Sequence, residues 1–243
     1  MCGRFVAATP PQMLAKQFAV DVVREVSDQP DFNVAPRRVI SVVRESVDDA
    51  GALVRVLQGM RWGLVPSWAK DLSVGDRMIN ARSETLAEKP SYKRAFATRR
   101  CIIPADAFYE WQKLPGQSRK QPMCIRRRDG QPMAFAGLYE RWRDPDAPED
   151  AESLMSTTII TGPPNELVAP IHDRMPVALP EAAWGEWLDP NDHDLHAVQS
   201  LLVPPPAGDF EAYPVSTRVN AVRDHDAGLV EPLPDDPQAT LLG

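Results

Sequence analysis

The chain has 243 residues, of which 43% are hydrophobic and 25% are charged, and its formal net charge is −7. This length and composition are typical of a globular protein with a sizeable core. No apolar run approaches the roughly 18 residues of a membrane-spanning helix, and no basic and then apolar segment indicates a secretory signal. We therefore exclude an integral membrane protein and expect a cytoplasmic one.

The acidic charge is concentrated in two stretches, and these alone exceed the net charge. They contain Asp144, Asp146, Glu149, Asp150 and Glu152, then Asp224, Asp226, Glu231, Asp235 and Asp236. The rest of the chain is slightly basic, so a groove for nucleic acid is compatible with the acidic total. We expect residues 144–152 to form an exposed loop. Residues 224–243 are predicted to form a frayed acidic tail after one domain of residues 1–223.

The first half of the chain predicts both helices and strands. Thr9-Pro10-Pro11 opens a short helix, and strands at 39–44 and 53–57 flank a turn at 48–51. A helix near residue 92 then precedes a buried strand at 101–104. Cys101 and Cys124 lie in apolar strand contexts, and their spacing fits neither a disulfide framework nor a zinc motif, so we interpret both as core residues.

The second half contains the clearest hairpin signal, with strands 123–128 and 133–142 around Asp129-Gly130. A strand at 154–161, a short helix at 164–169, helices near 184–188 and 195–202, and a last strand at 213–216 follow. No internal repeat is present, and strands are scattered along the whole chain. This order favours one mixed, strand-rich α+β domain.

Cys2 is the first residue with unusual chemistry. If Met1 is removed, Cys2 carries a free α-amine and a thiol on adjacent carbons, with ordinary pKa values of about 8 and 8.5. Such an aminothiol condenses with an aldehyde through a Schiff base, and the thiol then closes a thiazolidine ring. The alternative is that position two has no function.

Three further side chains have two open interpretations each. Glu110 lies between aromatic residues, either as an exposed strand residue or as a desolvated acid suited to proton transfer. Trp68 follows a Pro-Ser turn and is either buried or available for stacking on a ligand. His172 alternates with Arg174, so both face one side if the segment is extended, and the histidine is either structural or functional.

Together, seven segments resemble the SOS-response-associated peptidase (SRAP) family, whose members shield abasic sites in single-stranded DNA. They are residues 1–5 (MCGRF), 33–36 (NVAP), 61–66 (RWGLVP), 80–85 (NARSET), 108–111 (FYEW), 171–176 (IHDRMP), and 214–216 with 219–220 (PVS, VN). The segments follow the family order over nearly the whole chain. The resemblance implies an α+β fold, a single domain with a curved, mostly antiparallel, barrel-like β core and flanking helices.

The resemblance also implies roles for individual residues. Cys2 would form a thiazolidine with the ring-opened sugar of an abasic site, Asn80 would hold the sugar or the N-terminus, and Glu110 and His172 would move protons. The implied DNA-binding residues are Arg4, Arg82 and Arg174 on phosphates, where the bidentate geometry of arginine suits the ligand, and Trp68 on a base. No metal or organic cofactor is indicated.

The family name implies an enzyme that removes its own Met1 with Cys2 as nucleophile, and processing by an aminopeptidase is equally compatible with the sequence. Reversal of its own crosslink is a further expected activity. Two other functions stay open. One is a cysteine peptidase that acts on other proteins through Cys2, His172 and Glu110. The other is a noncovalent single-strand binder. We expect a nucleoid-associated monomer, with abasic single-stranded DNA as its partner and replication-associated proteins as further candidates.

Overall fold

Five strands close into a barrel in the computed structural model of this protein, which describes residues 2–48, 50–148 and 150–234. The barrel strands are β4 (Val39–Val47), β5 (Leu53–Trp62), β7 (Arg100–Ala105), β10 (Met133–Trp142) and β11 (Leu154–Gly162). Their order is β11-β10-β7-β4-β5, and a parallel pairing of β5 with β11 closes the ring. Every other pairing in the ring is antiparallel, so the predicted barrel-like α+β core is confirmed.

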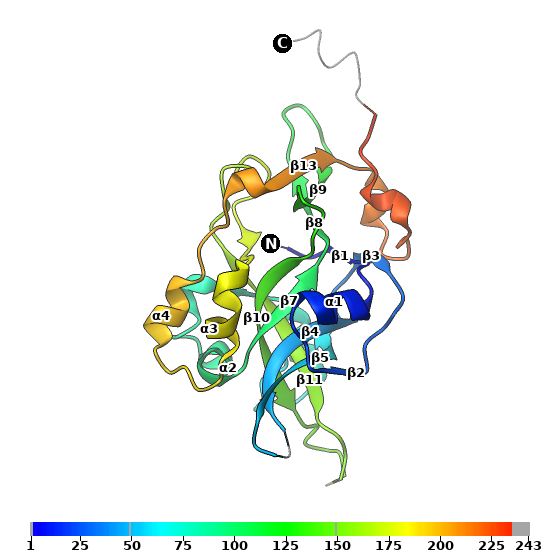
Figure 1. Cartoon of the computed structure of the whole chain (residues 1–243). Helices are drawn as coiled ribbons and strands as arrows, with labels where there is room; N and C mark the ends of the chain where they lie inside the picture. Colours follow the sequence, from blue (N-terminus) through cyan, green and yellow to red (C-terminus); the bar gives the residue numbers. More distant parts are fainter. Residues whose placement is uncertain (1, 49, 149, 235–243) are drawn as a thin grey trace.

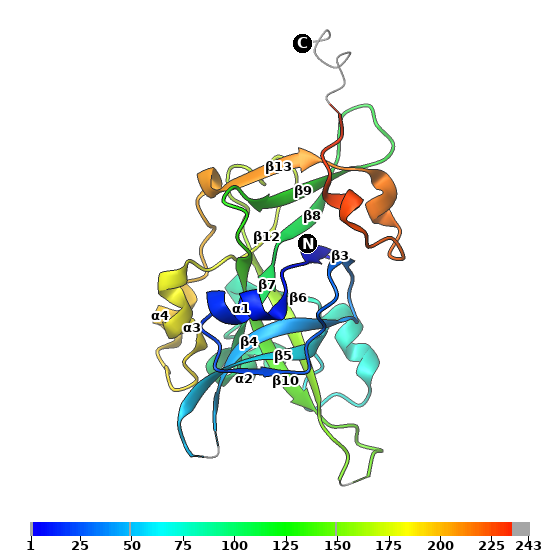
Figure 2. The same cartoon turned by 45° about the vertical axis from the view of Figure 1, so that its right-hand side comes forward.

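A second, antiparallel sheet lies over one end of the barrel (Figure 1). Its order is β13 (Phe210–Pro214), β9 (Gln121–Arg127), β8 (Ala107–Gln112), β1 (Phe5–Ala7) and β3 (Asp31–Val34). The chain passes from β7 in the barrel to β8 in this sheet through the single residue Asp106. In Figure 2, β3 lies between the barrel and strands β9 and β13, and Figure 1 shows β1 beside β3, so the start of the chain is brought to the junction.

Short strands and helices complete the fold. β2 (Val22–Arg24) and β6 (Asn80–Arg82) run parallel to β5 and β11, and β12 (Met175–Pro176) runs antiparallel to β11. The α-helices are α1 (Pro11–Gln17), α2 (Pro90–Thr98), α3 (Trp184–Leu188) and α4 (Leu195–Ser200), of which the last three gather on one side of the barrel (Figure 1). The 3₁₀ turns are η1 (Leu72–Arg77), η2 (Ser83–Thr85), η3 (Glu181–Ala183), η4 (Ala207–Asp209), η5 (Thr217–Asn220) and η6 (Ala227–Val230).

Aromatic packing fixes the first strand against the barrel. The rings of Phe5 and Trp62 meet edge to face with centroids 5.2 Å apart, and both side chains are fully buried. Such pairs contribute about 1 kcal/mol beyond their buried area. Cys2 belongs to the same apolar cluster, so burial of Phe5 carries the preceding residues into the interior. Cys101 and Cys124 are fully buried, which confirms their prediction as core residues.

Three predictions from the sequence are wrong. Strands β9 and β10 do not pair as a hairpin, because β9 joins β8 and β13 while β10 joins β7 and β11. Residues 164–169 form hydrogen-bonded turns instead of a helix. The segment from Asp224 to Pro234 is packed instead of frayed: Leu229 is fully buried, and the amide of Phe32 donates to the carbonyl of His225 at 3.2 Å. The rest of the predicted tail, residues 235–243, lies outside the described residues.

Candidate active site and nucleic-acid interface

Cys2 lies just before β1, an inner strand of the second sheet, and is fully buried. The amide of Tyr109 on β8 donates to the carbonyl of Arg4 at 3.0 Å, which extends the β1–β8 pairing toward the start of the chain. The Cys2 side chain is 0% exposed, and its thiol is 3.6 Å from the carbonyl oxygen of Arg4. A residue of small side chain therefore occupies the interior where the sheet meets the barrel.

Asn80 joins the barrel to this buried residue. It begins β6, which runs beside β11 in the register Asn80–Ile159, and its side-chain amide donates to the carbonyl of Cys2 at 2.8 Å. The hydroxyl of Tyr92 on α2 donates to the Asn80 carbonyl at 3.2 Å. The side-chain oxygen of Asn80 is buried and has no hydrogen-bond partner among the described residues. This acceptor is available to an amine or a hydroxyl brought to Cys2.

Glu110 supplies a desolvated carboxyl group beside Cys2. It lies on β8 and is only 2% exposed, which settles the two sequence interpretations in favour of the buried acid. Burial raises the pKa of the Glu110 carboxyl above its ordinary value. Burial, and then the charge of Glu110, raises the pKa of the Cys2 thiol far above its usual range. The site therefore favours a neutral thiol and a carboxyl that holds a proton closer to neutral pH.

His172 reaches Glu110 from the turn that precedes β12. Its amide donates to the carbonyl of Val168 at 2.9 Å, and its Nε2 lies 3.8 Å from Glu110 Oε2. The amide of Arg174 donates to His172 Nδ1 at 3.0 Å, so in the neutral ring the proton is assigned to Nε2, on the side of Glu110. The exposed carboxylate of Asp173 also lies 2.9 Å from Nδ1.

The three predicted phosphate-binding arginines have different environments. Arg174 donates to both carboxylate oxygens of Glu84, and this ion pair lowers the pKa of Glu84. Arg82, on β6 two residues after Asn80, is exposed. Arg4 donates to the side-chain oxygen of Asn33 and to the carbonyl of Val219, both at 2.8 Å. No described carboxylate lies within ion-pair distance of Arg4, so its charge is not neutralised.

Trp68 stands apart from these contacts. Its side chain is 61% exposed, which agrees with the interpretation of a surface residue, whereas Trp62 six positions earlier is fully buried. The loop around it is anchored, because the indole of Trp142 donates to the carbonyl of Ala69 at 2.8 Å. An exposed indole on an anchored loop offers a flat apolar surface at small cost in conformational freedom.

The structure thus joins Cys2 to Asn80 by a hydrogen bond and Glu110 to His172 by proximity. Sequence reasoning did not assign roles to Asn33, Glu84 or Tyr92, each of which contacts a candidate residue. Asn33 and Glu84 lie inside segments that carried the family resemblance, which was the one available signal.

The described residues contain no cluster of three or more His, Cys, Asp or Glu side chains that could hold a metal ion. No helix in the described ranges is long and apolar enough to cross a membrane.

Comparison with known proteins defines the class. The family model for SOS response associated peptidases (SRAP) matches residues 1–222. The chain belongs to this family.

Relatives of known designation span nearly the whole chain. It is 43% identical over 233 residues to the abasic site processing protein YoqW of Bacillus subtilis (strain 168), covering 95% of this chain and 99% of that relative. It is 31% identical over 267 residues to the abasic site processing protein HMCES of Gallus gallus, covering 96% of this chain and 78% of that relative. A crystal structure of a protein from Bacteroides thetaiotaomicron has the same fold, with a TM-score of 0.80 at 24% identity, over 96% of this chain and 100% of that one.

Proposed function

We propose that this protein shields abasic sites in single-stranded DNA by forming a thiazolidine crosslink through Cys2 after removal of Met1. The single observation that carries the proposal is the burial of Cys2 beside Asn80 and Glu110, with the Asn80 amide on the Cys2 carbonyl at 2.8 Å. Two relatives in bacteria and birds are designated abasic site processing proteins, which supports abasic DNA as the target.

The chemistry needs one amine, one thiol and a proton donor. The α-amine of Cys2 attacks the aldehyde carbon of the ring-opened sugar, and the resulting carbinolamine loses water to give a Schiff base. The sulfur then adds to the imine carbon while its proton passes to the nitrogen, which closes the ring. The net change is one water lost from amine, thiol and aldehyde together. Because the product has no free aldehyde, the strand is protected from β-elimination.

Glu110 and His172 suit the proton transfers of this sequence. The raised pKa of Glu110 favours the protonated carboxyl, which donates its proton to the departing hydroxyl, and the resulting carboxylate then accepts the thiol proton and passes it to the nitrogen. The Nε2–H of His172, 3.8 Å from Glu110 Oε2, exchanges protons with Glu110 and with the sugar oxygens. The same steps in reverse hydrolyse the crosslink, so one set of residues serves formation and release.

The strand is held in this proposal by arginines and by stacking. Arg4, Arg82 and Arg174 bind phosphates around the lesion, and Trp68, which is 61% exposed, stacks on a neighbouring base. An unpaired strand avoids the cost of about a few kcal/mol for extracting a nucleotide from a duplex. Noncovalent single-strand binding is then the first step of the reaction and not a separate function.

A cysteine peptidase acting on other proteins is less well supported. Such enzymes use a thiolate, which is formed when a neighbouring positive charge lowers the pKa of the cysteine. Here the burial of Cys2 and the charge of Glu110 act in the opposite direction. Removal of Met1 within the same chain needs only one turnover, so a slow nucleophile suffices for that step.

The test compares single-stranded oligonucleotides with and without one abasic site on denaturing gels. The proposal predicts a denaturation-resistant adduct with the abasic oligonucleotide only, and none with Cys2→Ala. Cys101→Ala is the matched control, because Cys101 is equally buried but lies in β7. Persistence of the adduct in Cys2→Ala contradicts the proposal, and cleavage of an unrelated protein without any DNA adduct favours the peptidase.

A further inference from the structure

The side chain of Asn33 connects β3 to Arg4, near the start of the chain, and to residues 219–224. Asn33 lies on β3 with its side chain 2% exposed. Its side-chain oxygen accepts the hydrogen bond from Arg4, and its two amide hydrogens are shared among the carbonyls of Val219, Ala221 and Asp224 at 3.2, 3.1 and 2.7 Å. Asn33 therefore uses both ends of its amide, one for Arg4 and the other for the segment 218–226, which begins within η5.

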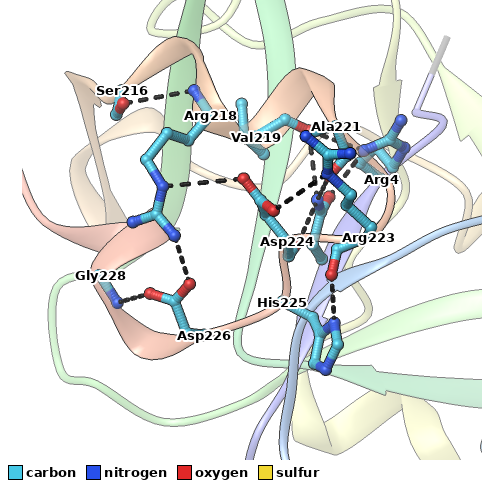
Figure 3. A network of polar contacts seen from close by, with 11 residues as sticks. Arg4, Ser216, Arg218, Val219, Ala221, Arg223, Asp224, His225, Asp226 and Gly228 are labelled. Carbon is cyan, nitrogen blue, oxygen red and sulfur yellow. Dashed lines mark hydrogen bonds and ion pairs between the residues drawn. The ribbon is translucent and has the colours of Figure 1, made fainter.

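That segment closes over Arg4 (Figure 3). The carbonyl of Val219 accepts from Arg4 at 2.8 Å, and the carbonyl of Asn220 lies 3.5 Å from the same guanidinium. Asn220 also accepts through its side-chain oxygen from the indole of Trp111, the neighbour of Glu110, at 2.7 Å. In Figure 3, Arg218 lies between Asp224 and Asp226, and these ion pairs fold the segment back on itself.

A count of donors indicates what the guanidinium of Arg4 is arranged to do. An arginine has five N–H donors, and Arg4 uses three of them on neutral oxygens. Two remain, and no described carboxylate cancels the charge. By contrast, the two terminal nitrogens of Arg174 donate to the carboxylate of Glu84, which neutralises its charge. Neutral acceptors fix the orientation of Arg4 and leave its positive charge for an anion.

We propose that Asn33, acting with the Val219 and Asn220 carbonyls, is a positioning residue that holds Arg4 ready for the phosphate next to the reacting sugar. The inference rests on the proposed function for its ligand, the DNA backbone. Arg4 is two residues from Cys2, so its Cα lies at most about 7 Å from that of Cys2. This short separation favours a phosphate close to the abasic nucleotide as the ligand of Arg4. In this proposal the segment 218–226 is part of the site through the backbone carbonyls of Val219 and Asn220.

The test is a double-mutant cycle between Asn33→Ala and Arg4→Ala, read as the affinity for an intact single-stranded oligonucleotide across a range of salt concentrations. Each variant alone is expected to bind about tenfold more weakly, since a charge-assisted hydrogen bond is lost. Each also lowers the slope of log affinity against log salt by about 0.7, as one phosphate contact on a single strand does. In the Arg4→Ala background, Asn33→Ala is expected to cause no further loss.

Gln58→Ala is the matched control, because the Gln58 side-chain oxygen accepts from buried Arg44 at 2.8 Å within the barrel. It removes the same kind of amide-to-guanidinium bond and should leave the salt slope unchanged. If Asn33→Ala fails to fold, as judged by thermal unfolding, Asn33→Asp replaces it: the carboxylate keeps the contact with Arg4 but cancels its charge, so the slope again falls.

Two results overturn the inference. One is an unchanged salt slope in whichever Asn33 variant folds. The other is an equal loss of affinity in the Arg4 parent and in the Arg4→Ala background, as a merely structural residue would give. Adduct formation with an abasic oligonucleotide is measured separately on the parent protein. Absence of that adduct contradicts the proposed function, whereas the binding cycle still decides the role of Asn33.

Discussion

The side-chain amide of Asn80 donates to the main-chain oxygen of Cys2 at 2.8 Å, joining β6, which pairs with barrel strand β11, to the segment that precedes β1. This bond fixes the main chain that carries the proposed nucleophiles. Tyr92, whose hydroxyl donates to the Asn80 carbonyl, supports Asn80 from helix α2. The position of Cys2 therefore depends on contacts from the sheet, the barrel and a helix.

Asn80→Ala should slow adduct formation by about fivefold, because one hydrogen bond contributes about 1 kcal/mol to holding Cys2. The measurement is the single-turnover rate with an abasic oligonucleotide. Asn191→Ala, at an exposed position after α3, is the control and should react at the parental rate. A parental rate in Asn80→Ala would remove this hydrogen bond from the account.

Glu110→Gln should slow the reaction and also change the pH dependence of stability. The folded-state pKa of Glu110 is raised, so the folded chain retains a proton that the unfolded chain has released. The parent therefore loses stability as pH rises from the unfolded pKa of about 4.5 toward the folded value. Glu110→Gln removes this cost, so its melting temperature should exceed that of the parent at neutral pH, with a smaller difference near pH 4. Thermal unfolding at several pH values measures this, and a gap that widens toward low pH would contradict the assignment.

Glu84→Gln should strengthen binding to single-stranded DNA. The carboxylate of Glu84 is hydrogen-bonded to both terminal nitrogens of Arg174 and competes there with a phosphate, so its removal strengthens the contact of Arg174 with the strand. We expect the salt slope of binding to become steeper by about 0.7. Asp129→Asn releases Arg127 from a similar ion pair outside the site and makes the same change in net charge. Equal effects of the two substitutions would mean that Arg174 does not contact the strand.

Trp68→Ala should weaken binding with little effect on stability. Its side chain is 61% exposed, so its loss should change the free energy of unfolding by less than about 0.5 kcal/mol, while a lost stacking contact costs about 1 to 3 kcal/mol in affinity. Trp62→Ala provides the contrast, because Trp62 is fully buried and its loss should cost about 3 to 5 kcal/mol of stability. Unchanged affinity in Trp68→Ala would exclude stacking.

The family could be predicted from the sequence because its short motifs occur in order, and that resemblance implied the barrel-like core. The strand signals by themselves predicted only a mixed α+β domain. The pairing of strands could not. Residues 123–128 and 133–142 flank a good turn, yet nine of the ten β10 residues are buried, and such a strand finds partners by long-range packing. The turn at Asp129-Gly130 therefore passes the chain from one sheet to the other.

The candidate site could also be predicted only in part from the sequence. The individual residues Cys2, Glu110 and His172 could be nominated from composition and motif, since their chemistry is carried by the side chain itself. The supporting contacts could not, because Arg4 meets the carbonyl of Val219 across 215 positions of sequence. Backbone acceptors leave no signature in residue type, so the contact between Arg4 and residues 219–220 could not be predicted from the sequence.

The most direct test of the central claim is intact mass spectrometry of the protein after incubation with a single-stranded oligonucleotide carrying one abasic site, with and without borohydride. The account predicts a chain without Met1, and an adduct equal to that chain plus the oligonucleotide less one water. Borohydride should leave the adduct mass unchanged, because a thiazolidine, unlike a Schiff base, offers no imine to reduce. A chain that has lost Met1 and forms no adduct, or an adduct that gains two hydrogens from borohydride, would contradict the thiazolidine.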